Sequence, residues 1–171
     1  MRSALSAAAI TGAAALSLSL VPAAANAANA APSPTTSRAR SLSAATTEAG
    51  SWRPYGNTNP ITSSSSTWRC ASTETIAASV LAQVCAIRSP GGGSVQGAVI
   101  VRNNRSNLYS TTASMDLFTT SGIGLGDWAC SSSGVGAHSW SVCFGRTLTQ
   151  SSPVNSEGFA GGTYLGISSA V

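Results

Sequence analysis

Four cysteines occur in two similar units, and this arrangement constrains the fold more than any other feature of the sequence. Each unit has a Trp-x-Cys string, followed by a Val-Cys pair and then an arginine. The residues are Trp68, Cys70, Val84, Cys85 and Arg88, and then Trp128, Cys130, Val142, Cys143 and Arg146. An even number of cysteines in a small exported chain predicts disulfide bonds. No comparable pattern in the sequence indicates a chemical reaction.

Residues 1–30 have the pattern of a secretory signal peptide. The second residue is basic, residues 4–21 form an apolar run rich in Ala, and residues 25–27 and 28–30 both read Ala-Asn-Ala. A membrane anchor is the alternative, because about 20 apolar residues can cross a bilayer. We expect cleavage after the first or the second triplet, secretion into the extracellular space, and no membrane association afterwards.

A metal site is the alternative use for the cysteines, but the sequence lacks the ligands. No cysteine has a C-x2-C neighbour, and His138 is the only histidine. Local zinc spacing therefore cannot be assembled. We expect disulfides, no metal and no other cofactor.

The formal net charge is +4, and every cation is an arginine. These arginines are scattered along the chain, whereas nucleic-acid-binding proteins cluster their cations along one face or groove. We therefore expect no nucleic-acid partner.

Composition divides the exported chain into two parts. Residues 31–66 are rich in Ser, Thr and Pro and predict a disordered arm, because so few apolar side chains cannot offset chain entropy. Within this arm, Trp52 and Tyr55 are candidates for docking it onto the body. Residues 67–171 have the size of one sandwich domain.

In the body, apolar residues recur with a period of two, and Gly and Asn cluster between the runs, which is typical of strands and turns. The pattern predicts an all-β, single antiparallel β-sandwich of immunoglobulin-like or related Greek-key type. A helix over residues 74–86 is the alternative. The expected strands are Val80 to Arg88, Val95 to Asn103, Tyr109 to Thr119, Trp128 to Ser131 and Ser139 to Thr149.

Four cysteines allow three pairings. Exchanging the two units leaves each pairing unchanged, so the similarity of the units does not favour any one of them. Loop length favours Cys70–Cys85 and Cys130–Cys143 as cross-strand bridges, each stabilising by roughly 2–4 kcal/mol. Whether the units are a true duplication stays open, because the residues between the shared positions match poorly.

Residues two apart on a strand share a face. Trp128 should therefore lie with Cys130, while Trp140, Val142 and Phe144 should point the other way and form core. A tryptophan beside a disulfide is either packed on the bridge, as in immunoglobulin-like sandwiches, or part of a recognition surface.

No catalytic constellation is convincing. A Ser-His-Asp triad with His138 lacks a G-x-S-x-G elbow, and a solvated loop histidine is the alternative. A glycosidase needs two acids about 5–9 Å apart, and nothing in the spacing of Glu74, Asp116, Asp127 and Glu157 indicates such a pair. The glycine clusters lack the Lys and helix of a phosphate cradle and predict turns.

Two kinds of binding remain. Aromatic side chains with polar tips can stack on sugar rings, and Trp128, Tyr109 and Tyr164 are the candidate ligand-binding residues. A rigid loop held by disulfides could instead block a hydrolase cleft. An unknown extracellular protein or polysaccharide is the expected partner.

The Ala-rich leader, the lysine-free chain, the Ser/Thr-rich arm and the W-x-C…V-C frame resemble small, uncharacterised exported proteins of streptomycetes and related actinobacteria. The resemblance implies secretion and a β-rich fold, but no activity. We expect a secreted binding or interaction protein that is not an enzyme. The alternatives are an inhibitor of an extracellular hydrolase and a cell-surface structural protein.

Overall fold

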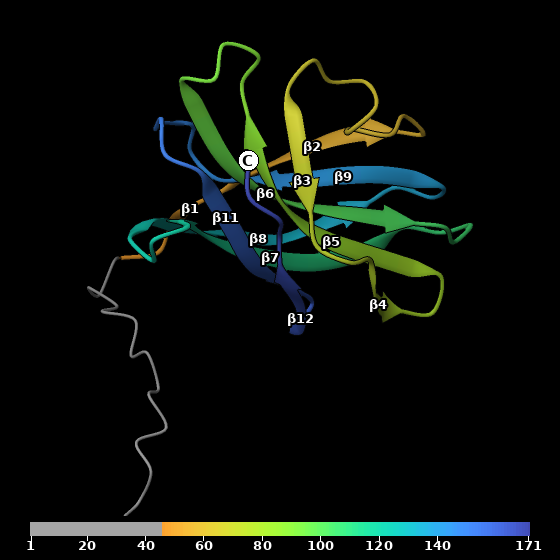
Figure 1. Ribbon diagram of the computed structural model, residues 1–171. Coiled ribbons are helices and arrows are strands. Elements are labelled where there is room, and N and C mark those ends of the chain that lie inside the picture. Colours follow the sequence, from red (N-terminus) through yellow and green to blue (C-terminus); the bar gives the residue numbers. More distant parts are fainter. Residues whose placement is uncertain (1–45) are drawn as a thin grey trace, which may run out of the picture. The chain divides into compact units, whose positions relative to one another are not determined.

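The computed structural model describes residues 46–171, which form two packed β-sheets and contain no helix (Figure 1). One sheet has five strands, in the order β1 (Glu48–Ala49), β8 (Gly124–Val135), β7 (Tyr109–Thr119), β11 (Val154–Ala160) and β12 (Thr163–Ile167). The other has seven. Its main order is β2 (Ser51–Gly56), β9 (Ser139–Phe144), β6 (Ser94–Asn103), β5 (Val80–Arg88) and β3 (Thr67–Cys70), with β10 (Leu148–Thr149) beside β6 and β4 (Glu74–Ala77) beside β5.

This architecture confirms the predicted all-β sandwich. β5 and β7 have the expected bounds, and β6 differs by one residue. Residues 74–86, the helical alternative, form β4 and most of β5. The run predicted from residue 139 to 149 is divided into β9 and β10.

The predicted boundary between arm and domain is wrong, because ordered strands begin well before Thr67. β1 pairs in parallel with β8, and β2 pairs with β9, with Trp52 opposite Cys143. Pro60 is buried, and Ile61 packs against the outer face of the seven-stranded sheet. Composition failed here because edge strands tolerate Ser, Pro and Gly when one neighbouring strand supplies the pairing. The predicted signal peptide and the rest of the arm lie outside the described residues.

The main core lies between the two sheets. Alternate residues of β5 and β6, among them Val84 and Val99, face Met115 and Leu117 of β7, and all four side chains are at most 1% exposed. The opposite face of the seven-stranded sheet is also apolar, with Ile100 and Val142 buried in a second cluster. When both faces of a sheet are apolar, the alternation of apolar and polar residues along a strand no longer shows which face points into the core.

Both predicted disulfide pairings are confirmed. Cys70 and Cys85 are opposite each other on β3 and β5, as expected for a cross-strand bridge. Cys130 and Cys143 instead lie on β8 and β9, which belong to different sheets, so this bridge joins the layers and was wrongly predicted as cross-strand. The two units are therefore not equivalent in the fold.

The predicted faces of the tryptophan units need a correction that follows from this bridge. Trp128 does lie on the same face as Cys130, but that face is the core, and the ring is only 1% exposed. Gly126 and Gly145 contact the ring, since a Cβ on either would lie 2.6 Å from it. The indole N–H donates to Glu48 Oε2 at 3.2 Å. Trp128 thus lies in the same buried cluster as Cys130 and Cys143, between the two sheets.

Candidate functional site

The structure does not bring the three predicted ligand-binding residues together. Trp128 is enclosed between the sheets and offers no open ring face. Tyr109 packs against the end of the core, with the Arg105 guanidinium 4.9 Å above its ring. Tyr164 is 49% exposed and contacts Phe159 on the five-stranded sheet. These three residues therefore do not form one stacking surface, and Tyr164 is the most exposed of them.

Aromatic rings and arginines gather instead on the outer face of the seven-stranded sheet. Trp68 meets Phe144 edge to face, with ring centroids 6.1 Å apart, and Tyr55 lies 6.5 Å from Phe144. The Arg53 guanidinium lies 5.9 Å from the centroid of the same ring. We call this surface the aromatic-arginine face. It comprises Tyr55, Trp68, Trp140, Phe144, Arg53 and Arg102.

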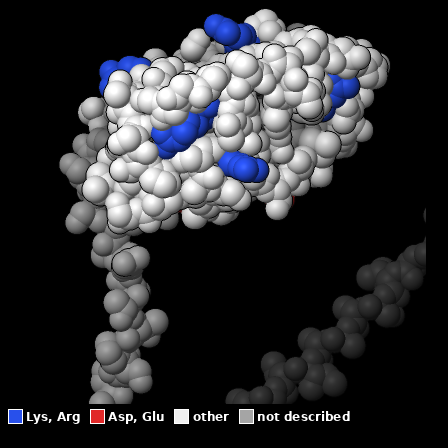
Figure 2. All heavy atoms as spheres, turned by 45° about the horizontal axis from the view of Figure 1, so that its top comes forward, with Lys and Arg blue, Asp and Glu red and all other residues white. Residues whose placement is uncertain are grey.

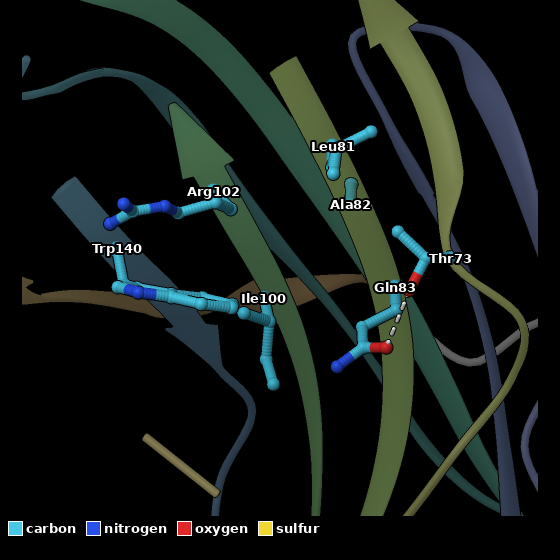
Figure 3. Close-up of a pocket in the computed structure, with 7 residues that line it drawn as sticks. All are labelled: Thr73, Leu81, Ala82, Gln83, Ile100, Arg102 and Trp140. Carbon is cyan, nitrogen blue, oxygen red and sulfur yellow. Dashed lines mark hydrogen bonds between the residues drawn. The ribbon is translucent and has the colours of Figure 1, made fainter. Parts of the chain in front are cut away.

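One end of this face is hollowed into a small pocket (Figure 3). Its volume is about 100 Å³, its base includes Ile100 and Leu81, and the Trp140 ring forms one side. On the other side, Thr73 Oγ1 donates to Gln83 Oε1 at 3.1 Å. That bond leaves the Gln83 amide nitrogen without a partner among the described residues. The pocket therefore combines an apolar base, an aromatic wall and an available donor.

Arg102 is held rigidly at the rim of this pocket. Its Nε donates to Asn104 Oδ1 at 2.8 Å, and its Nη1 donates to the His138 carbonyl at 2.8 Å. The guanidinium carbon lies 5.1 Å from the centroid of the Trp140 ring, in cation–π geometry. Arg102 and Trp140 are opposite each other on β6 and β9. The remaining guanidinium N–H groups are thus fixed in direction before any ligand arrives.

Charge is distributed unevenly over the sandwich. Figure 2 shows separate arginine side chains on one face and almost no acidic side chain there. On the outer face of the five-stranded sheet, Glu157 is opposite Asp116, and Asp116 is opposite Asp127. The arginines form isolated patches in this view, without the continuous stripe that nucleic-acid binding uses.

Three of the four candidate catalytic acids lie side by side in the fold, which their spacing in the sequence did not indicate. Glu157, Asp116 and Asp127 form a row across three neighbouring strands, so strand register brings together acids far apart in the sequence. Glu74 lies in β4 of the other sheet. His138 occupies the exposed turn between β8 and β9 with a φ of 49°, and its backbone N–H donates to the Arg105 carbonyl.

Residues 46–171 contain neither a metal-binding cluster nor a membrane-spanning helix. No group of three or more His, Cys, Asp or Glu in this part of the chain is arranged to hold a metal ion. This same stretch contains no helix that is long and apolar enough to cross a membrane.

The sequence matches no protein-family model, and a comparison with curated proteins found no matching sequence. The site must therefore be interpreted from its own geometry.

Sequence reasoning missed Trp140 and Arg102. The alternation of Trp140, Val142 and Phe144 correctly placed them on one face, but that face was assigned to the core. Arg102 lies between Val101 and Asn103, which are both fully buried, and two residues after Ile100. Residues two apart on a strand share a face, so Arg102 marks the face of β6 that it shares with Ile100 as the outer one.

Proposed function

We propose that this protein is a secreted binding protein, without catalytic activity, which recognises another extracellular protein through the aromatic-arginine face. The pocket beside Trp140, with Arg102 fixed at its rim, is the observation that carries the proposal. The two disulfides indicate an oxidising environment, which supports secretion. The resemblance to exported streptomycete proteins points the same way.

The pocket size favours a protein partner over a free small molecule. Small-molecule sites usually measure about 300–1,000 Å³, whereas this pocket holds about 100 Å³. That volume suits one protruding side chain. Tryptophan, tyrosine and arginine are also the residues most enriched at the energetic centres of protein interfaces. An apolar base with a polar rim is the usual anatomy of such a surface.

The fixed arginines favour an acidic partner. Arg102 presents unused guanidinium N–H groups at the pocket rim, and Arg53 lies on the same face above Phe144. A carboxylate of the partner can accept a bidentate pair of bonds from such a guanidinium. Because Arg102 is already immobilised by Asn104 and His138, little side-chain entropy is lost on binding.

Affinity capture with interface variants tests this proposal. The oxidised protein is immobilised and exposed to secreted proteins of the producing culture, and retained proteins are identified by mass spectrometry. The binding constant for each purified candidate is then measured by calorimetry. We expect Trp140→Ala and Arg102→Ala each to weaken binding at least tenfold, since interface hot spots contribute about 2 kcal/mol or more. Arg102→Lys should restore only part of the affinity, because lysine lacks the planar fork.

A control variant separates specific recognition from general loss of structure. Arg69 is exposed on β3, and Arg69→Ala should leave the captured proteins unchanged. Equal capture by wild type, Trp140→Ala and Arg102→Ala would contradict the proposal. If the captured acidic partner is an extracellular hydrolase, inhibition should appear as slowed turnover in the presence of stoichiometric protein.

A further inference from the structure

A second and larger groove lies on the opposite side of the sandwich. It crosses the outer face of the five-stranded sheet beside the turn from β11 to β12 and has a volume of about 420 Å³. This volume falls in the usual range of ligand sites, unlike the pocket beside Trp140. We call it the Phe159 groove. The residues that matter here are Phe159, Thr112, Ser114, Ser131, Gly161 and Gly162.

The groove is bordered by an exposed aromatic pair. Phe159 is 44% exposed, Tyr164 is 49% exposed, and their ring centroids are 5.2 Å apart. Among the described residues, five large apolar side chains are exposed, and Phe159, Tyr164 and Ile167 of this hairpin are three of them. Single exposed apolar residues need no explanation, but a contiguous group marks an interaction site.

The groove walls are fixed in place by the fold. The Trp52 indole N–H donates to the Ser131 carbonyl at 2.8 Å, which ties β8 to β2. The Gly161 N–H donates to the Thr112 carbonyl at 3.0 Å, which anchors the turn at the groove edge. Phe159 is opposite Ser114 on β7. The groove therefore exists before a ligand binds, which lowers the entropic cost of binding.

The lining chemistry identifies a ligand class. None of the residues lining the groove is charged, so it has no counter-ion for a strongly ionic ligand. The side-chain hydroxyls of Thr112, Ser114 and Ser131 can each donate and accept a hydrogen bond. The Phe159 ring offers an apolar face beside them. A pyranose ring matches this pattern, because its C–H face packs on an aromatic ring while its hydroxyls meet polar groups.

We propose that the Phe159 groove binds a neutral polysaccharide, with one sugar ring stacked on Phe159 and its hydroxyls bonded to Ser114 and neighbouring groups. This site is separate from the aromatic-arginine face and does not depend on the function proposed for that face. A protein that carried both sites would hold a protein partner at a glycan surface.

Calorimetric titration of the full oxidised protein with neutral oligosaccharides tests this site. The probes are soluble hexamers of β-1,4-linked glucose, N-acetylglucosamine, xylose and mannose, each at concentrations up to about 5 mM. Saturable binding of at least one hexamer is expected. Phe159→Ala should weaken that binding tenfold or more, and Ser114→Val should weaken it several-fold. The exposed position of Phe159 means that its variant should fold normally, which circular dichroism verifies.

Ile123→Ser is the matched control, because Ile123 is 62% exposed near the other end of β7 and does not line the groove. Its affinity should equal that of wild type. Absence of binding across all the hexamers, or equal affinity of Phe159→Ala and wild type, would overturn the proposal. Release of reducing sugar during the titration would show hydrolysis and overturn a purely binding role. Protein capture by the opposite face should be unaffected by Phe159→Ala, so the two proposals fail independently.

Discussion

Gly50 provides a sensitive test of how tightly the interlayer disulfide is enclosed. This residue joins β1 to β2, and a Cβ added to it would lie 2.7 Å from Cys130 Sγ and 3.2 Å from Cys143 Sγ. Non-bonded heavy atoms have their optimum separation near 3.5–4.0 Å. The extra methyl of Gly50→Ala must therefore displace the bridge or the chain. We expect the free energy of unfolding to fall by about 1–3 kcal/mol, the usual cost of overpacking.

The same substitution should be nearly harmless once the sulfurs are gone. The double variant Cys130→Ala/Cys143→Ala loses roughly 3 kcal/mol of loop-closure stabilisation and leaves a void beside Gly50. With the two sulfurs gone, the Phe144 carbonyl oxygen, at 3.1 Å, is the remaining close contact of the new methyl, which fills part of the void. The cost of Gly50→Ala should then drop below about 1 kcal/mol. This difference corresponds to a coupling of about 1–2 kcal/mol between the sites.

Urea unfolding of the four proteins in this cycle, followed by tryptophan fluorescence and circular dichroism, measures the coupling. Thiol titration checks that the bridge has formed in the proteins that retain both cysteines. Gly91→Ala is the control, because a Cβ at Gly91 would meet no atom within 4 Å, and its stability should change by less than about 0.5 kcal/mol. An equal cost of Gly50→Ala in both backgrounds would refute the close packing of Gly50 on the bridge.

Three further outcomes follow from the fold. Arg88 donates to four main-chain oxygen atoms, including one of Val171, so Arg88→Met should lower the unfolding free energy by about 2 kcal/mol or more in urea titration. The buried amide of Asn103 donates to three carbonyls, and Asn103→Ala should cost about 1–3 kcal/mol by the same assay. A chain beginning at Thr67 lacks β1 and β2 and should lose cooperative thermal unfolding, whereas one beginning at residue 46 should retain it.

Sequence patterns predicted β5 from a nearly continuous apolar run and β7 from alternation of buried and exposed residues. β5 and β7 place Val84 and Met115 at regular two-residue steps among buried neighbours, and their bounds were predicted correctly. β11 was missed because its inward residues include Ser156 and Gly158, which carry almost no hydrophobic signal. Gly158 is small for a reason: a Cβ there would lie 2.5 Å from the Ser114 carbonyl oxygen. Because β11 and β7 approach closely here, β11 has no apolar side chain at this position, and the alternation that would predict a strand is absent.

The candidate sites were harder to predict because they depend on register. Loop length gave both cysteine pairs, but it could not distinguish a hairpin from a change of sheet between Cys130 and Cys143. Tyr164 was identified by residue type alone, while Phe159 beside it belongs to no motif. The pocket beside Trp140 needs β5, β6 and β9 in one sheet with defined partners. That pairing is a tertiary property that local sequence does not encode.

The position of β1 and β2 at the start of the described chain governs the order of assembly. Glu48 has its partner at Trp128, and Trp52 has its partner at Cys143. These first strands therefore have nothing to pair with until more than half of the polypeptide has been synthesised. Such long-range pairing is slow to form and must follow closure of the intervening chain. β1 and β2 consequently join the edges of their sheets late, after β8 and β9 have emerged.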